Sequence, residues 1–270
     1  MGVAARETPP QRPHSRNVPT RRPMDSVRDS VFFVSDGHFG LGNDEAGKNR
    51  CFAEMAAEMR GRATDLYILG DLFDFWIEYR HAIRPDYFLV LHELRGLVQA
   101  GVKVHYLTGN HDFALGNFLE KTVGVAVGKT MHASLQGRNV YMRHGDNINK
   151  SGGLKFAERL MHSRFLQTLY KALHPNIGVK LGRLCSAASK KRSRERGISE
   201  EDLQKYRRAA QTYLKSKKCD LVILAHTHHS ELVRFDEGEY CNTGSWMDNY
   251  DYAVMRGGEI RLCRWLVGKD

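Results

Sequence analysis

Short apolar runs that are each followed closely by Asp, His or Asn recur along this chain and constrain its fold more than any other feature. Four of the runs are rich in β-branched or aromatic residues, as buried strands are, and they occupy residues 31–34, 66–69, 102–107 and 221–224. Between the first three, residues 44–61 and 85–100 have apolar residues at helical spacing. Strands that alternate with helices predict βαβ units, a mostly parallel sheet and the α/β class.

The remaining apolar segments predict a second sheet. Residues 131–143 resemble a hairpin, because two apolar stretches flank a polar turn that contains Gly137. Beyond Leu232, short alternating runs are separated by glycines such as Gly238 and Gly244. We expect these runs to form mainly antiparallel strands.

Two segments interrupt this pattern. Residues 1–28 contain five prolines and scattered arginines without apolar periodicity, so they predict a disordered tail, although a transit peptide or a later start at Met24 stays open. Residues 151–218 predict a helical cap, with a capped acidic helix start at Ser199. The catalytic core then comprises residues 29–150 and 219–270, and the cap precedes the last parallel strand.

Composition excludes several classes of protein. No run approaches the roughly 18 uninterrupted apolar residues of a membrane span, and the N-terminus lacks an apolar leader, so we expect a cytoplasmic protein. The five cysteines are odd in number, widely spaced and without a CxxC pair, which argues against a disulfide framework or a zinc–thiolate site. The sequence leaves the oligomeric state open.

Charge is distributed unevenly. The net charge is +10, yet residues 150–218 alone carry 18 Lys or Arg against five Asp or Glu. The core is therefore acidic, and it carries a basic segment that favours an anionic partner: nucleic acid, an anionic membrane surface or an anionic substrate.

Polar motifs with metal-ligating side chains follow the predicted strands, where open α/β sheets place their sites. The motifs are Asp36-Gly37-His38, Gly70-Asp71-Leu72-Phe73-Asp74, Gly109-Asn110-His111-Asp112, His144-Gly145-Asp146 and Ala225-His226-Thr227-His228. Each motif alone is most often a polar turn. Together, at successive strand ends, they predict a metal centre.

The residue types suit two neighbouring divalent ions. Ions about 3.5–4 Å apart can clamp both oxygens of an in-line displacement at phosphorus. Asp71 would supply the bridging carboxylate, and the amide oxygen of Asn110 would add a ligand without charge. Imidazoles suit borderline transition ions. In extended loops residues i and i+2 point the same way, so we expect each Asp-x-His or His-x-His pair to approach the ions from one side.

This combination of motifs resembles the calcineurin-like metallophosphoesterase superfamily, from Val31 to Trp265. The resemblance implies a four-layer α/β-β/α sandwich with an inserted helical cap. It implies one ion held by Asp36, His38, Asp71 and His228, and a second held by Asp71, Asn110, His144 and His226. It also implies that His111, oriented by Asp112, acts near the leaving group or stabilises the transition state. We expect Mn²⁺, with Fe or Zn²⁺ as alternatives.

A finer resemblance is to the UDP-2,3-diacylglucosamine pyrophosphatases of lipid A synthesis, carried by Gly70–Trp76, Gly109–Phe113 and the cap that follows His144. It implies hydrolysis of this nucleotide lipid to UMP and 2,3-diacylglucosamine 1-phosphate (lipid X), with the acyl chains in an apolar groove of the cap. It implies peripheral contact with the inner membrane surface on its cytoplasmic face. Contacts to the substrate are carried over to Asn110, Ser189, Ser193 and Arg196.

Three features depart from the resemblance, and alternatives stay open. His111 stands where the best-known branch has Arg, no acidic residue lies next to Gly152, and Ala225 replaces a usual Gly. The basic run at residues 189–196 reads equally as a solvated loop, and the apolar stripe of the cap as an ordinary amphipathic helix. A nuclease or phosphodiesterase is the competing enzyme, but no nucleic-acid module is evident and we expect no nucleic-acid partner. A non-catalytic scaffold is disfavoured because all seven ligand positions are filled.

Overall fold

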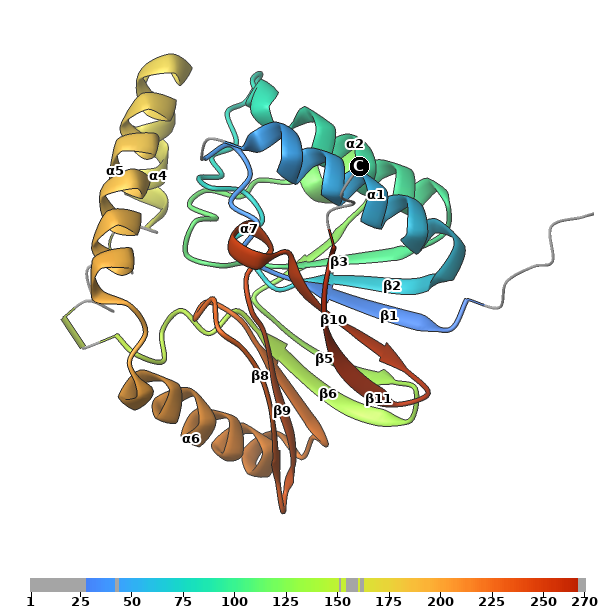
Figure 1. The fold of residues 1–270 in the computed structure, drawn as a ribbon. Helices are drawn as coiled ribbons and strands as arrows, with labels where there is room; N and C mark the ends of the chain where they lie inside the picture. The colour runs from blue at the N-terminus through green and yellow to red at the C-terminus, as the bar shows by residue number, and fades with distance from the viewer. Residues whose placement is uncertain (1–27, 42–43, 151, 154–159, 161–162, 267–270) are drawn as a thin grey trace, which may run out of the picture.

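The chain folds into two β-sheets that pack face to face, with helices covering both outer faces (Figure 1). The computed structural model describes residues 28–41, 44–150, 152–153, 160 and 163–266, so the tail predicted for residues 1–28 lies almost wholly outside them. The α/β class and the four-layer arrangement predicted from the resemblance are confirmed.

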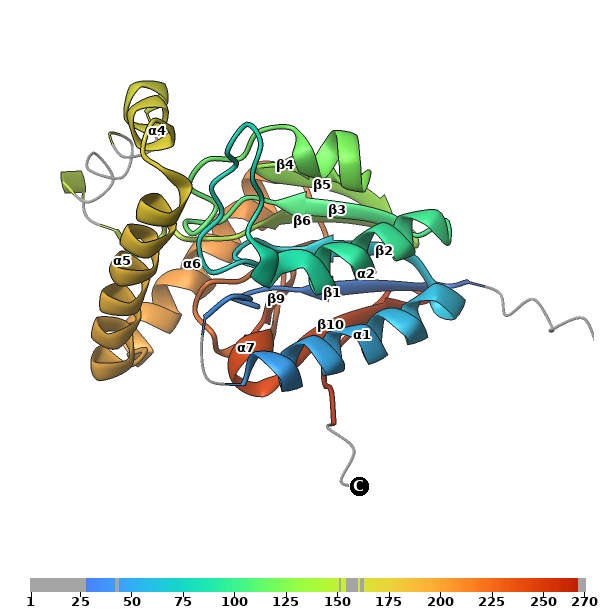
Figure 2. The same cartoon turned by 90° about the horizontal axis from the view of Figure 1, so that it is seen from above.

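The first sheet has the strand order β11-β10-β1-β2-β3-β4. Its parallel strands are β1 (Ser30–Val34), β2 (Ala63–Ile68), β3 (Lys103–Leu107) and β4 (Ala126–Gly128), and its antiparallel edge is β10 (Asp251–Arg256) with β11 (Glu259–Arg264). The helices α1 (Glu45–Arg62) and α2 (Phe88–Gln99) cover its outer face, with short helical turns at Pro85–Tyr87 and Leu119–Val123. Figure 2 shows α1 and α2 lying over these strands.

Both faces of this sheet are buried, one under the helices and the other against the second sheet. Successive side chains of a strand point to opposite sides, so each strand contributes to both clusters. Phe32 and Val34 of β1 pack in the cluster under α1 and α2. Val31 and Phe33 pack in the cluster between the two sheets. Continuous apolar runs such as that of β1 are therefore required here, rather than the alternation of a half-exposed strand.

The second sheet has the order β5-β6-β7-β9-β8. It contains the predicted hairpin, β5 (Thr130–Leu135) and β6 (Arg138–Arg143), followed by β7 (Leu221–Leu224), β8 (Ser230–Phe235) and β9 (Gly238–Thr243). The helix α6 (Glu200–Lys217) covers its outer face, where Tyr206 and Leu214 pack against Val222 and Tyr240.

Two predictions about the sheets are wrong. The run at residues 221–224 was expected in the parallel sheet, but it forms β7 in the middle of the second sheet. The runs beyond Leu232 pair antiparallel as predicted, β8 with β9 and β10 with β11, but β10 and β11 belong to the first sheet. The second sheet is mixed, because β7 pairs in parallel with both β6 and β9. An inner strand buried on both faces has the same composition in either sheet, so the residues alone do not indicate which sheet it joins.

The segment predicted as a cap has two parts. The helices α4 (Arg164–Lys171) and α5 (Pro175–Arg196) stand to one side of the layers in both views (Figures 1 and 2). The helix α6 begins as predicted, with the Ser199 hydroxyl accepting from the Asp202 amide at 3.1 Å, but it packs on the second sheet. None of the described helices combines the length and the hydropathy that a bilayer span requires.

The packing of α6 on the second sheet should contribute to the free energy of unfolding. Leu214 is 2% exposed, so Leu214→Ala should lower the free energy of unfolding by about 2–5 kcal/mol, through lost burial and a cavity. The matched change Leu184→Ala, at a residue of α5 that is 60% exposed, should cost about 0.5 kcal/mol or less. Urea unfolding measures both, and equal costs would contradict the assignment of α6 to the core.

Candidate metal centre

The seven predicted ligands follow the carboxyl ends of five strands, which lie in both sheets. Asp36 and His38 follow β1, Asp71 follows β2, Asn110 follows β3, His144 follows β6, and His226 and His228 follow β7. The backbone of the loop after β1 is tied to the loop after β2, since the amide of Asp36 donates to the carbonyl of Gly70 and that of His38 to the carbonyl of Asp71. The site therefore lies where the ends of the two sheets meet.

One group of possible ligands consists of Asp36, His38 and His228, whose ligand atoms lie within 4.8 Å of one another. His228 Nε2 is 3.3 Å from Asp36 Oδ1, and His38 Nε2 is 3.9 Å from the same oxygen. Asp36 Oδ1 and His38 Nδ1 are buried without a hydrogen-bond partner. Buried polar atoms are rarely left in this state, and a cation would satisfy the carboxylate oxygen.

A second group consists of Asp71, His144 and His226, again within 4.8 Å. His144 Nε2 lies 3.1 Å from Asp71 Oδ2 and 3.1 Å from His226 Nδ1. The other ring nitrogen of His144 is 2.7 Å from the carbonyl oxygen of Leu69, to which it can donate. This contact leaves Nε2 available as a ligand, the arrangement typical of metal-binding histidines.

Asp71 belongs to both regions of the site. It forms a further group with His38 and His111, so its carboxylate lies within ligand range of residues from each set. The side-chain oxygen of Asn110 is buried and has no hydrogen-bond partner. Carboxylates, imidazoles and one free amide oxygen form a donor set that fits two divalent cations such as Mn²⁺, Fe²⁺ or Zn²⁺.

The backbone at these residues is unusual. Five of the predicted ligands have positive φ, a region that residues with a Cβ rarely adopt: Asp36 (50°), His38 (42°), Asp71 (52°), His226 (72°) and His228 (58°). The prediction of extended loops is therefore wrong, because these pairs converge through left-handed turns. Such strain costs about 1–3 kcal/mol per residue and gathers at functional sites. Ala225 is not among the described residues with positive φ, so its replacement of Gly adds no strain.

The buried carboxylates determine much of the electrostatics of the site. Burial alone would lower the pKa of His144, but the Asp71 carboxylate outweighs it and raises this pKa to about 10. Burial likewise opposes the charged form of His228, and Asp36 still raises its pKa to about 10. Burial and the charge of His144 lower the pKa of His226 to about 4. The buried carboxylates thus favour positive charge at this point of the fold, which bound cations would supply.

His111 is held differently from the prediction. Its Nδ1 atom lies within hydrogen-bond distance of the backbone oxygen of Asp74, and 3.7 Å from the Asp74 carboxylate. Asp112 instead accepts from the hydroxyl of Tyr106 at 2.7 Å and from the amide of Gly109 at 2.8 Å. The prediction that Asp112 orients His111 is therefore wrong, because this short side chain turns back onto its own loop. Burial, with the nearby Asp71 carboxylate, raises the pKa of Asp112 to about 7.

Two neighbours of the site were not predicted. Asp74 stands in the quoted motif after β2, three residues from Asp71, and that spacing was the available signal. Asp248 lies in the short helix α7 (Trp246–Asn249), and its Oδ2 is 2.7 Å from His228 Nδ1. No motif marks Asp248, since it is 20 residues from the histidine that it contacts.

The predicted substrate contacts of the cap are only partly described. Ser189, Ser193 and Arg196 lie in the last two turns of α5, so the backbone there is helical and the alternative of a loop is wrong. Their side chains lie outside the described residues, as do Leu154 and Phe156 of the apolar stripe.

The described part of the cap joins the core beside the metal centre. Tyr170 packs against Phe75 and Phe113, and the Ser186 hydroxyl donates to the Asp74 carboxylate at 2.5 Å. Other apolar side chains stay exposed on α4 and α5: Phe165 (77%), Leu169 (59%), Ile177 (59%), Leu181 (43%) and Leu184 (60%). An ordinary amphipathic helix packed on the core would not leave so many of them in solvent.

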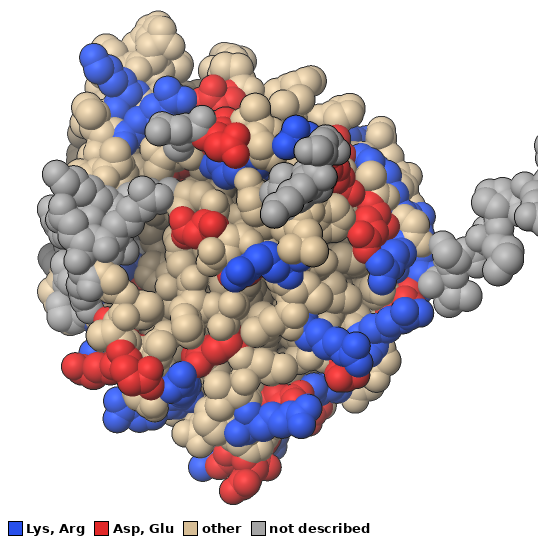
Figure 3. Space-filling model, in the orientation of Figure 1, with Lys and Arg blue, Asp and Glu red and all other residues tan. Residues whose placement is uncertain are grey.

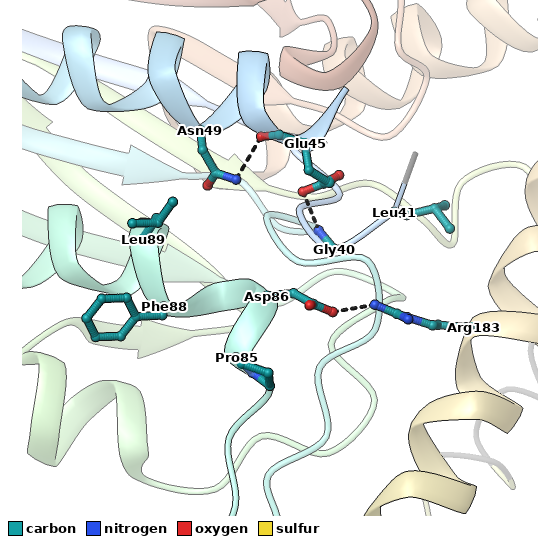
Figure 4. Close-up of a pocket in the computed structure, with 9 residues that line it drawn as sticks. All are labelled: Gly40, Leu41, Glu45, Asn49, Pro85, Asp86, Phe88, Leu89 and Arg183. Atoms are coloured by element: carbon teal, nitrogen blue, oxygen red, sulfur yellow. Dashed lines mark hydrogen bonds and ion pairs between the residues drawn. The ribbon is translucent and has the colours of Figure 1, made fainter. Parts of the chain in front are cut away.

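A pocket of about 500 Å³ opens next to the loop that carries His38 (Figure 4). Leu41, Phe88 and Leu89 give it apolar walls. Figure 4 shows Arg183 of α5 reaching to Asp86 of the core, with which it forms an ion pair. Core and cap thus both contribute to this pocket.

Comparison with known proteins identifies the fold family. The family model described as calcineurin-like phosphoesterase matches residues 30–230. A protein of Porphyromonas gingivalis named UDP-2,3-diacylglucosamine hydrolase is 28% identical over 259 residues, covering 87% of this chain and 97% of its own length. A protein of Ralstonia nicotianae with the same name is 27% identical, covering 87% and 90%.

Solved structures are more distant. An archaeal phosphodiesterase shares 13% identity with a TM-score of 0.47, covering 87% of this chain and 99% of that one. The family model spans both groups of possible ligands, together with the strands that carry them. The resemblance seen in the motifs is confirmed, and the chain belongs to the calcineurin-like phosphoesterase family.

Proposed function

We propose that this protein hydrolyses UDP-2,3-diacylglucosamine to UMP and 2,3-diacylglucosamine 1-phosphate, using two divalent ions, for which Mn²⁺ is expected. The observation that carries the proposal is the position of the Asp71 carboxylate, which belongs to the group with His144 and His226 and also lies within ligand range of His38 from the other group. Membership in the phosphoesterase family supports hydrolysis at a phosphate ester or pyrophosphate, and the names of the relatives support this nucleotide lipid.

Seven side chains would hold the ions. Asp36, His38, Asp71 and His228 would bind the first, and Asp71, Asn110, His144 and His226 the second. When bound, such a pair supplies a nucleophile at neutral pH and neutralises negative charge on the phosphoryl oxygens. The protein contributes fixed positions for these ligands, because the loops that carry them are anchored to buried strands.

His111 would act on the substrate itself. Since its Nδ1 can donate to the backbone oxygen of Asp74, its Nε2 is free to face the substrate. The side chain is 17% exposed, and its ring lies 4.6 Å from that of His38, between centroids. From there it can stabilise charge on the phosphoryl group or protonate the leaving oxygen.

The cap would receive the lipid part of the substrate. The exposed apolar side chains of α4 and α5 and the apolar pocket at Leu41 and Phe88 provide surface for acyl chains. A substrate that resides in a membrane also requires contact with the bilayer, and the same exposed residues support peripheral contact with the cytoplasmic face of the inner membrane.

The competing nuclease activity receives less support. On the face shown in Figure 3, acidic and basic side chains are interspersed, and the described residues of that face form no continuous basic stripe. Proteins that track a nucleic-acid backbone generally need such a stripe.

Purified protein loaded with Mn²⁺ should release UMP from UDP-2,3-diacylglucosamine, and a chelator should abolish the release. The matched control is a UDP-sugar without acyl chains, which should react much more slowly because it makes no contact with the apolar surfaces. UMP can be quantified by chromatography. Equal rates on the two substrates would argue against a lipid substrate, and no release from either would contradict the proposal.

His111→Ala should leave metal binding intact and slow the chemical step by about 10²–10⁴-fold, the usual contribution of a positioned acid or base. Metal binding should survive because the backbone amide of His111, which donates to Asp71 Oδ1 at 2.8 Å, is retained. His105→Ala is the control, since His105 pairs with Asp65 on the first sheet. Metal content by mass spectrometry and single-turnover rates test this, and near-normal turnover in His111→Ala would rule out the role.

A further inference from the structure

Asp248 contacts the candidate metal centre from outside every motif described above. It lies beyond residues 30–230, the segment matched by the family model. Its carboxylate oxygen Oδ2 is 2.7 Å from Nδ1 of His228, whose other nitrogen, Nε2, is 3.3 Å from Asp36 Oδ1. The imidazole of His228 thus lies between two carboxylates, one on each side of the ring.

The helix that carries Asp248 is fastened to the loop after β1. The amides of Trp246 and Met247 donate to the carbonyl oxygens of Ser35 and Asp36, both at 3.1 Å. The Ser245 hydroxyl donates at 2.9 Å to Asp248 Oδ2, the same oxygen that contacts His228, and so helps to hold the carboxylate in place. Asp36 and Asp248 therefore belong to one braced unit, although 212 positions separate them in sequence.

His228 depends on such support more than His38 and His144 do. Its side chain is 32% exposed, whereas those of His38 and His144 are 5% and 1% exposed, so packing alone does not fix its ring. A neutral imidazole also exists in two tautomers. An acceptor at Nδ1 selects the tautomer with its proton on Nδ1 and leaves the Nε2 lone pair free to bind a metal.

We propose that Asp248 is a positioning residue for the first ion: by accepting from His228 Nδ1, it fixes the ring orientation and the tautomer that present Nε2 beside Asp36. This inference rests on the proposed metal-dependent function. Asp248 contacts Nδ1 of His228, whereas the ion would bind Nε2 on the other side of the ring. Asp248 therefore acts through His228 and not as a ligand of the same ion. The second group of ligands, which contains His144 and His226, does not depend on Asp248.

Titration of metal-stripped protein with Mn²⁺ tests the proposal through affinity rather than turnover. Asp248→Ala should lower the affinity for one of the two ions by about 100-fold. Asp248→Asn keeps an acceptor oxygen and the side-chain volume, so it should lower that affinity by about tenfold. Loss of a partner of a metal-binding histidine typically costs about 10–100-fold in affinity. The other ion should bind as in the wild type. Asn249→Ala is the control on the same helix, because the Asn249 side chain contacts Asp251 instead, and it should bind both ions normally.

Thermal unfolding in the presence of a chelator, where no ion contributes, should give equal midpoints for all four proteins. If Asp248→Ala alone unfolds at a lower temperature, the metal affinities of Asp248→Asn and the wild type are compared instead, since Asn has the same shape as Asp. Wild-type affinities in both Asp248 variants, or an equal loss in Asn249→Ala, would overturn the inference while leaving the proposed function intact. Binding of fewer than two ions by the wild type would overturn the proposed function, and the inference with it.

Discussion

The site is organised around the placement of one buried carboxylate, Asp71, between two sets of histidines. Its Oδ1 accepts from the amide of His111 at 2.8 Å, and its Oδ2 lies 3.1 Å from His144 Nε2. The neighbouring glycines leave the necessary space. A Cβ on Gly109 would lie 2.2 Å from Asp71 Oδ1, and a Cβ on Gly70, which has φ of +93°, would lie 2.7 Å from the His144 ring. The two glycines therefore allow Asp71 to face both groups at once.

Rigid surroundings allow this arrangement to persist. Five left-handed residues in one site represent several kcal/mol of strain, which the loops could not sustain if they were free to relax. They are anchored instead to strands buried on both faces and to each other. Lys48, which is 4% exposed, donates to the carbonyl oxygens of His38 and Leu41 and so braces the loop after β1 from α1. A layered α/β fold with its site at strand ends provides this rigidity.

Much of this arrangement could be predicted from the sequence, because it depends on local signals. The apolar runs predicted the strands, the cap at Ser199 predicted the start of α6, and motifs at strand ends predicted which residues gather. The predictions that were wrong or missing concern features that depend on contacts between residues distant in sequence or on backbone geometry. The run at residues 221–224 gives no indication of which sheet it joins, the left-handed turns at Asp36 and His226 occur at residues that disfavour them, and Asp248 reaches the site only through tertiary folding.

The central claim is that the loops of both sheets create two adjacent cation sites with a shared Asp71. Anomalous diffraction from crystals soaked in Mn²⁺ tests it most directly. The account predicts two peaks about 3.5–4 Å apart, with the Asp71 carboxylate between them. A single peak, or two peaks of which neither contacts Asp71, would contradict it.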